Sequence, residues 1–294
     1  MNTGVDEAAV FGGACCKICG RCGLEITGHT ARCGHCGVLL YYPYPPGSHP
    51  SFTTREESLS WYTRSAAFNH VNFTRMLRFA AGERSAAAAL SILDYGGGGG
   101  QFALVCRSHY PLATVYLVDV NDDSALAEWA PFSTRLRFTA FPGDATRFDL
   151  IFLNDVFEHL DDPVSVLRML AGKLARGGRI FIDTPRQFWI YPLTRLLSRG
   201  LHLKVLRGTV SAMHLQIWSR ASFRLAVERA GLRVERLARW AEFTMPPEFY
   251  LNNMGITHPL LRFAGRATYA AAGFILRNKI VCVLGEQSAA AGSR

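Results

Sequence analysis

Residues 90–105 read LSILDYGGGGGQFALV, and this stretch decides the fold that the sequence predicts. Its apolar residues 91–93 are typical of a buried strand that ends in Asp94, and a helix is expected from Gln101 onward. Five glycines join the two, so the backbone can approach a ligand closely and the helix N-terminus can offer free N–H groups. Glycine richness alone is weak evidence. The strand before the glycines and the helix after them predict a ligand-binding turn of an α/β fold.

A second strand that ends in an acid supports this interpretation. Residues 114–118 are apolar, and Asp119 follows them about 19 residues after Gly100, close to the spacing of about 20 that doubly wound folds use. An acid at this strand end suits the two hydroxyls of a ribose. A helix N-cap is the structural alternative, although Asn121 or Asp122 could supply that cap equally well.

The pattern Asp94-x-Gly96-x-Gly98-x-Gly100 resembles motif I of the class I S-adenosylmethionine-dependent methyltransferases. The five glycines are also close to the G-x-G-x-x-G fingerprint of dinucleotide-binding proteins, and Asp94 is the residue that favours the methyltransferases. In that family the loop wraps the amino-acid part of the cofactor, so no pyrophosphate is needed. The resemblance implies that S-adenosylmethionine contacts Asp94, Gly96, Gly98, Gly100, Asp119 and Val120.

Residues 148–185 resemble a further element of the small-molecule methyltransferases. A strand over residues 150–153 ends in Asn154 and Asp155, which would line the cofactor cleft because ligands bind at the carboxyl ends of parallel strands. A helix is expected after Asp162, up to the pair Gly177-Gly178. The apolar face of this helix is predicted to consist of Val164, Leu167, Leu170 and Leu174.

With residues 214–232 included, the resemblance covers about residues 88–240 and implies a seven-stranded Rossmann-like doubly wound sheet. The last two strands are expected over residues 233–243 and 279–284, with helical structure over residues 251–276 between them. The family commonly places an acidic–aromatic pair near the adenine, after the third strand. That stretch is compressed here, and Asp144 is the candidate adenine contact.

Methyl transfer is an in-line displacement from a sulfonium, so the protein has to position the acceptor and remove its proton where required. His159 lies just beyond the fourth strand, where the substrate should enter, and His214 is a second candidate base. Glu158 is expected to support the loop. The alternative is that His159 only holds the start of the following helix.

Six of the eight cysteines lie in residues 15–36, and this cluster contains three C-x-x-C pairs, Cys16/Cys19, Cys19/Cys22 and Cys33/Cys36, each followed by glycine. Two such knuckles grip a tetrahedral zinc, so a zinc ribbon is predicted around a short hairpin. The preferred ligands are Cys16, Cys19, Cys33 and Cys36, with Cys22 in place of Cys16 as the alternative and with His29 and His35 as further candidates. A disulfide framework is disfavoured without a secretion signal. Four thiolates leave no open position, so the metal should be structural. A similar ribbon precedes some bacterial class I methyltransferases.

The Pro-rich stretch YYPYPPGSHP, residues 41–50, marks a module boundary. We expect a zinc-ribbon module with its linker over residues 1–50 and a methyltransferase domain over residues 51–294. Within the second domain we expect a lid insertion at about residues 186–218, and C-terminal helices with the last strand over residues 245–284.

The composition limits the class of protein to which this chain can belong. The 294 residues are 49% hydrophobic with a net charge of +9, which excludes a wholly disordered chain. No apolar run approaches the ~18 residues of a membrane span, so we expect a soluble cytoplasmic protein. Residues 185–240 contain 11 Lys and Arg against two Glu, which favours an anionic or large, partly apolar substrate over a neutral one.

The leading hypothesis is therefore an S-adenosylmethionine-dependent methyltransferase with a small-molecule substrate. An RNA methyltransferase is the alternative enzyme, because cysteine knuckles and net basicity also suit nucleic acid. No aromatic–basic RNA-binding motif is present in the sequence, so nucleic acid is disfavoured as a partner. A non-catalytic, zinc-binding scaffold is the remaining alternative, and the intact Asp94–glycine loop and Asp119 argue against it.

Overall fold

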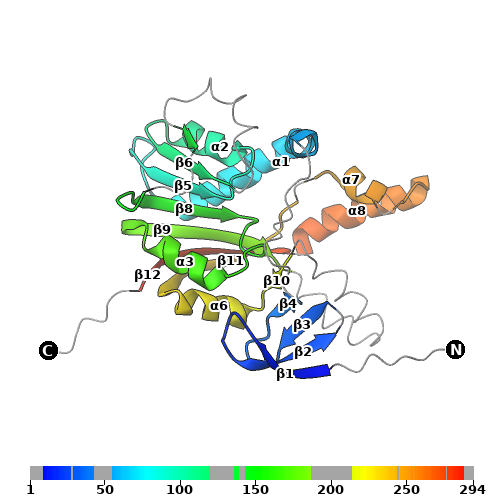
Figure 1. Cartoon of the computed structure of the whole chain (residues 1–294). Coiled ribbons are helices and arrows are strands. Elements are labelled where there is room, and N and C mark those ends of the chain that lie inside the picture. Colours follow the sequence, from blue (N-terminus) through cyan, green and yellow to red (C-terminus); the bar gives the residue numbers. More distant parts are fainter. Residues whose placement is uncertain are drawn as a thin grey trace.

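The computed structural model describes residues 9–27, 29–42, 55–119, 136–138, 143–186, 214–243, 245–253, 255–275 and 277–287. Val120, the Pro-rich residues 43–50 and most of the expected lid, residues 187–213, lie outside the described residues. Figure 1 shows the two sheets of the described part, with a small one at the N-terminus and a large one at the centre.

The large sheet has seven strands and is the predicted doubly wound sheet. Five neighbouring strands run parallel, and β12 is antiparallel to both of its neighbours. In spatial order the strands are β11 (Leu232–Trp240), β12 (Lys279–Glu286), β9 (Leu174–Pro185), β8 (Phe148–Asn154), β5 (Ser91–Tyr95), β6 (Thr114–Val118) and β7 (Leu136–Phe138). The strand order reverses at β5, because the chain proceeds to β6 on one side and to β8 on the other. The carboxyl ends of these strands therefore form the edge at which a ligand is expected.

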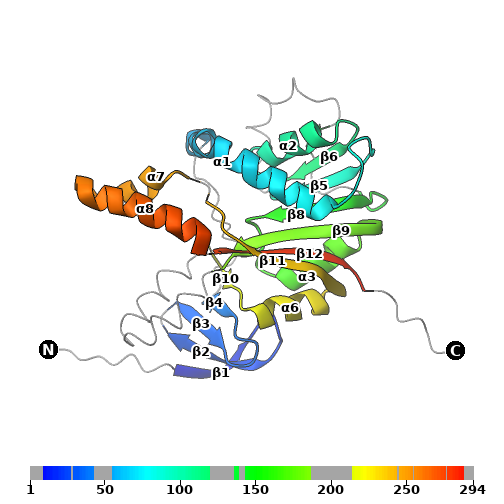
Figure 2. The same ribbon diagram turned by 180° about the vertical axis from the view of Figure 1, so that it is seen from behind.

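Helices cover both faces of this sheet (Figures 1 and 2). On one face, α1 (Arg55–Ala81) and α2 (Gln101–His109) pack on side chains such as Phe152, which lies in the same core cluster as Phe102. On the other face, α3 (Pro163–Ala171) and α6 (Arg220–Arg229) pack on side chains such as Ile151. Successive residues of β8 point to opposite faces, so its central residues 150–153 are all apolar and buried on both sides of the sheet.

The small sheet contains the cysteine region. Its order is β1 (Ala9–Cys15), β2 (Cys22–Thr27), β3 (Thr30–Cys33), β4 (Leu39–Tyr41) and β10 (Gln216–Ile217), and every pairing is antiparallel. The hairpin of β2 and β3 is the predicted one. Strand β10 was not predicted, and it joins a segment more than 170 residues away to the ribbon. The ribbon side chains Ile18 and Leu40 share one core cluster with Phe223 of α6, so the ribbon packs directly on the α3–α6 face.

Helix α3 begins as expected but ends earlier. Asp162 caps it, because its Oδ1 accepts a hydrogen bond from the Ser165 N–H at 3.0 Å. The helix ends at Ala171, so Leu174 starts β9 instead of lying on the helix face. The glycine pair lies inside β9 rather than at the helix end. A Cβ on Gly178 would lie 2.6 Å from the Phe148 carbonyl oxygen, so glycine is needed where the β8 and β9 backbones come close.

The C-terminal region differs in a similar way. The helical structure expected over residues 251–276 is two helices, α7 (Pro247–Asn253) and α8 (Pro259–Ile275). Gly255 lies between them with a φ of 68°, a left-handed conformation that glycine adopts without strain. None of the helices in the described part of the chain is long and apolar enough to cross a membrane.

Candidate active site and metal centre

The glycine loop connects β5 to α2 and folds back on the neighbouring strand. The Gly96 N–H donates to the Val118 carbonyl oxygen at 2.6 Å. Gly96, Gly98 and Gly100 all have positive φ, between 50° and 78°. A Cβ on Gly96 would lie 2.5 Å from a Val156 methyl, and one on Gly97 would lie 2.4 Å from Asp94 Oδ2. Glycine is therefore required both by the backbone conformation and by the space available.

The two predicted acids meet at this loop. Asp119 accepts a hydrogen bond from the Gly98 N–H through Oδ2 at 2.8 Å. Asp94 is 1% exposed, and its Oδ2 has no hydrogen-bond partner among the described residues. Burial and then the charge of Asp119 raise the pKa of Asp94 to about 8. A buried carboxyl oxygen without a partner is costly, so this position is suited to a polar or cationic group of a ligand.

The end of β8 supplies more polar groups to the same edge of the sheet. The side-chain nitrogen and oxygen of Asn154 are both buried and have no hydrogen-bond partner among the described residues. Asp155 follows with a φ of 51°, which is uncommon for a residue other than glycine and marks strained backbone of the kind that clusters at functional sites. The unpartnered amide makes Asn154 a candidate for ligand contact.

Asp144 lies elsewhere. Its carboxylate pairs with Lys173 Nζ at 3.2 Å, and Lys173 immediately precedes β9. Both residues therefore lie at the amino ends of the parallel strands, whereas the glycine loop lies at their carboxyl ends. The structure does not bring Asp144 to the glycine loop, because Asp144 precedes β8 and lies at the end where that strand begins.

The two predicted histidines come together, although they are 55 positions apart in the sequence. Their rings lie 5.1 Å apart between centroids. Glu158 is buried beside them, with its Oε1 3.9 Å from His159 Nε2 and its Oε2 accepting a hydrogen bond from the Thr184 hydroxyl at 3.0 Å. Burial, and then the charge of His159, lowers the pKa of His214 to about 4. His214 is therefore a neutral imidazole over the ordinary pH range.

A buried ion cluster that the sequence analysis missed lies next to the histidines. Lys279 Nζ contacts Asp155 and lies 2.9 Å from Asp183 Oδ2. Glu242 belongs to the same group of carboxylates. Burial alone would lower the pKa of Lys279, but these carboxylates raise it well above its usual value. The sequence signals for this cluster were weak: Asp183 lies near the end of one expected strand, and Lys279 lies at the start of another.

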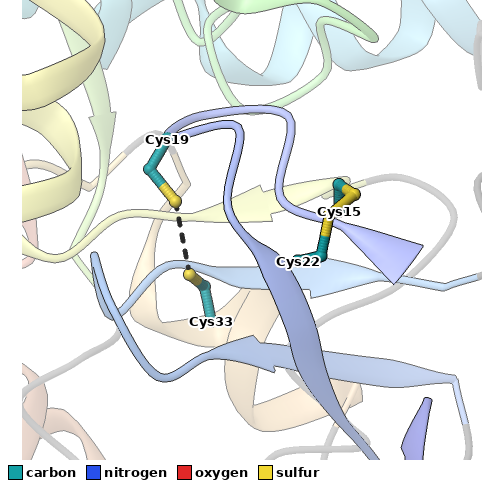
Figure 3. Close-up of a disulfide and its surroundings, with 4 residues drawn as sticks. All are labelled: Cys15, Cys19, Cys22 and Cys33. Carbon is teal, nitrogen blue, oxygen red and sulfur yellow. Dashed lines mark hydrogen bonds between the residues drawn. A yellow bond between two sulfur atoms is a disulfide. The ribbon is translucent and has the colours of Figure 1, made fainter. Parts of the chain in front are cut away.

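Four of the predicted metal ligands form one compact group. The sulfurs of Cys16 and Cys36 lie 3.7 Å apart, and those of Cys19 and Cys33 lie 3.6 Å apart (Figure 3 draws the second pair). All four sulfurs lie within 4.8 Å of one another. A tetrahedral zinc with Zn–S bonds of about 2.3 Å requires sulfurs about 3.8 Å apart. The hydrogen bond with Cys36 lowers the pKa of Cys16 to about 5. The four residues thus fit a structural zinc ion.

Cys22 does not join this group. It forms a disulfide with Cys15, and Figure 3 shows this disulfide apart from Cys19 and Cys33. This arrangement favours Cys16 over Cys22 as the fourth ligand, because a disulfide sulfur has no thiolate to offer a metal. His29 is also directed elsewhere, since its ring stacks on Tyr41 at 5.5 Å. Among the described residues, neither His29 nor His35 belongs to the group of possible ligands formed by the four cysteines.

Comparisons with known proteins agree with this geometry. A family model described as a methyltransferase domain matches residues 68–237. The methyltransferase str2 of Strobilurus tenacellus is 34% identical over 98 residues, which are 31% of this chain and 34% of that protein. The ubiquinone biosynthesis O-methyltransferase of Pseudomonas aeruginosa (strain LESB58) is 26% identical over 196 residues, which are 60% of this chain and 78% of that protein.

Solved structures with a similar fold include a chain of the complex between the Haloferax volcanii Trm112 methyltransferase activator and a methyltransferase. That match has a TM-score of 0.54 and 17% identity, and it covers 80% of this chain and all of that one. The plantazolicin methyltransferase BpumL with a triazolic desmethylPZN analog and SAH matches with a TM-score of 0.50 and 15% identity, over 80% of this chain and 91% of that one. At these identities the likeness concerns the fold alone.

Proposed function

The chain belongs to the class I S-adenosylmethionine-dependent methyltransferases, since the family model covers more than half of it, and we propose that it methylates a hydroxyl of a small molecule. The observation that carries this proposal is the pair of imidazoles 5.1 Å apart beside buried Glu158, at the edge of the sheet where β8 ends. Histidine is the side chain best suited to take a proton from a hydroxyl near neutral pH.

The cofactor is assigned to the loop between β5 and α2. When bound, S-adenosylmethionine supplies a methyl group on a positively charged sulfur. Asp94 and Asn154 offer buried polar atoms without partners, which suit the polar amino-acid part of such a ligand. Asp119 holds the Gly98 N–H through Oδ2 and follows β6 directly, the position at which an acid suits a ribose hydroxyl. Gly96 and Gly97 keep clear the space that a side chain would fill.

The acceptor is activated at the histidines. His159 would accept the proton of the acceptor hydroxyl, while the bound cofactor would supply the methyl group to the hydroxyl oxygen and leave as its neutral thioether. Glu158 Oε1 lies 3.9 Å from His159 Nε2, close enough to favour the protonated imidazole when Glu158 is ionised. His214 stays neutral because its pKa is lowered to about 4, so it orients the hydroxyl by accepting or donating a hydrogen bond.

A hydroxyl-bearing small molecule fits two further observations. The matched Pseudomonas protein is named an O-methyltransferase of ubiquinone biosynthesis. Residues 185–240 have an excess of basic side chains, which favours an acceptor with an anionic group. The zinc ion of the ribbon, held by Cys16, Cys19, Cys33 and Cys36, is assigned a structural role because four thiolates leave no position for substrate.

The test has a binding step and a transfer step. Calorimetry should detect binding of S-adenosylhomocysteine, and a screen of hydroxyl-bearing metabolites with labelled cofactor should reveal a mass gain of one methyl group. Replacement of His159 by Asn should lower kcat by about 10²–10⁴-fold and leave the affinity for S-adenosylhomocysteine unchanged. His70→Asn, at an exposed position of α1, is the matched control. Binding of NAD in place of the sulfonium cofactor, or transfer of label to RNA alone, would overturn the proposal.

A further inference from the structure

The four-cysteine ribbon and the histidine pair are connected by β10, and we propose that the ribbon positions His214 and the Glu158 loop for methyl transfer. The inference rests on the proposed function. It assigns to the ribbon a task at the active site in place of a purely local role in folding. The connection consists of three successive contacts.

The first contact is between the ribbon and β10. Gln216 and Ile217 pair with Leu40 and Leu39 of β4, and the Tyr41 N–H donates to the Leu215 carbonyl oxygen at 3.0 Å. A strand of two residues has no stability of its own, so β4 determines where β10 lies. His214 is two residues before β10, and its place therefore depends on this pairing.

The second contact is between β10 and the loop of residues 157–160, which carries Glu158 and His159. The Gln216 N–H donates to the Glu158 carbonyl oxygen at 3.1 Å, and its side-chain amide donates to the Leu160 carbonyl oxygen. Gln216 is fully buried. Trp218 also stacks on Phe157, with ring centroids 4.5 Å apart. The strand thus joins β4 on one edge to residues 157–160 on the other, and this loop carries His159.

The third contact brings the cysteine knuckles themselves to this region. The Ser219 hydroxyl donates to the Cys36 carbonyl oxygen at 3.1 Å, and Arg229 donates to the Ile18 carbonyl oxygen. Lys17 donates to the Asp161 carbonyl oxygen at 3.4 Å. Cys36 is only three residues before the start of β4. A metal that orders the knuckles therefore orders both β4 and the segment that bears His214.

The cofactor loop is held by a different set of contacts. Gly96 and Gly98 donate to Val118 and Asp119, at the end of β6. The ribbon instead donates to or accepts from residues 161, 215, 219 and 229. Loss of order in the ribbon should therefore disturb acceptor activation and spare cofactor binding.

The first experiment removes the metal from the full-length protein with a chelator and measures hydrogen exchange with and without it. We expect exchange at residues 215–218 to rise by about tenfold or more, while exchange at residues 96–106 and the Kd for S-adenosylhomocysteine change less than about twofold. Addition of Zn²⁺ should restore the protection, and kcat should follow it. A purified protein without metal, or unchanged exchange at residues 215–218 after metal loss, would overturn the proposal. Equal loss of protection in both regions would also overturn it, since that is global unfolding.

The second experiment keeps the metal and weakens one contact. Arg229→Met removes the bond to Ile18 and should raise exchange at residues 215–218 with full zinc content, whereas Arg224→Met, at an exposed position of the same helix, should not. No difference between the two variants would contradict the inference. Because exchange is measured without an acceptor, failure to find any methyl transfer would remove the proposed function and leave this result interpretable.

Discussion

The ammonium of Lys279 lies 2.9 Å from the carboxylate of Asp183, and both side chains are buried at the junction of β12 with β9. The same ammonium contacts Asp155, directly after β8. One cation thus joins two carboxylates from neighbouring parallel strands, at the edge of the sheet where the histidines lie. Its charge compensates anionic groups that would otherwise repel one another in a dry environment.

Replacement of Lys279 by Met should destabilise the protein by about 3–5 kcal/mol, because it leaves buried carboxylates without their cation. Urea unfolding followed by circular dichroism measures this change. The double variant Lys279→Met with Asp183→Asn should recover part of the loss, since it removes one of the uncompensated charges. Equal stabilities of the single variant and the wild type would show that the cluster is neutral without the lysine.

The second prediction concerns the dependence of stability on pH. The pKa of Asp94 is raised to about 8 in the folded protein, from an ordinary value near 3.8. The folded state therefore binds this proton more tightly than the unfolded state, so the contribution of Asp94 to stability is full below its unfolded pKa and is lost as the pH rises toward 8. In the absence of cofactor, Asp94→Asn should remove a fall of the order of a few kcal/mol between pH 5 and 8. Parallel curves for the variant and the wild type would contradict this assignment.

The third prediction tests the space inside the glycine loop. A Cβ on Gly97 would lie 2.4 Å from Asp94 Oδ2, so Gly97→Ala should displace the loop or the carboxyl and weaken S-adenosylhomocysteine binding by about tenfold or more. Gly143→Ala is the matched control, because no atom lies within 4 Å of the added methyl group. Calorimetric titration of both variants gives the comparison. Unchanged affinity of the Gly97 variant would place the cofactor elsewhere.

Much of the fold was predictable from patterns of residues that are close together in the sequence. The strands over residues 91–95 and 114–118 are short, mainly apolar runs with an acid close to their carboxyl end, and inner strands of a parallel sheet have this appearance whatever their neighbours are. The Asp162 cap was recognisable for the same reason, since it acts on a backbone N–H three residues away. These features depend on residues close together in the chain.

Features that depend on distant residues were not predictable in this way. Gln216 and Ile217 form a strand only because Leu39 and Leu40 lie beside them. The cluster around Lys279 exists only because β12 pairs with β9. Asp144 was assigned to the adenine by its position in the sequence. Its place at the amino ends of the strands follows from the direction in which the chain enters β8, and no motif records that direction.

The last prediction separates the metal ligands from the disulfide. Cys16→Ser should abolish zinc binding or reduce it strongly, because three thiolates remain where four sulfurs lie within 4.8 Å of one another. The double variant Cys15→Ser with Cys22→Ser should retain one equivalent of zinc, since these two residues are bonded to each other and lie outside that group. Metal analysis of purified protein measures both, and thermal unfolding should show the larger loss of stability for Cys16→Ser. The reverse result, loss of zinc in the double variant alone, would mean that Cys22 is the ligand and that the disulfide does not persist when metal is bound. A cysteine sulfur can form a disulfide or bind zinc as a thiolate, but it cannot do both at once. The zinc content of these two variants therefore decides whether Cys16 or Cys22 is the ligand.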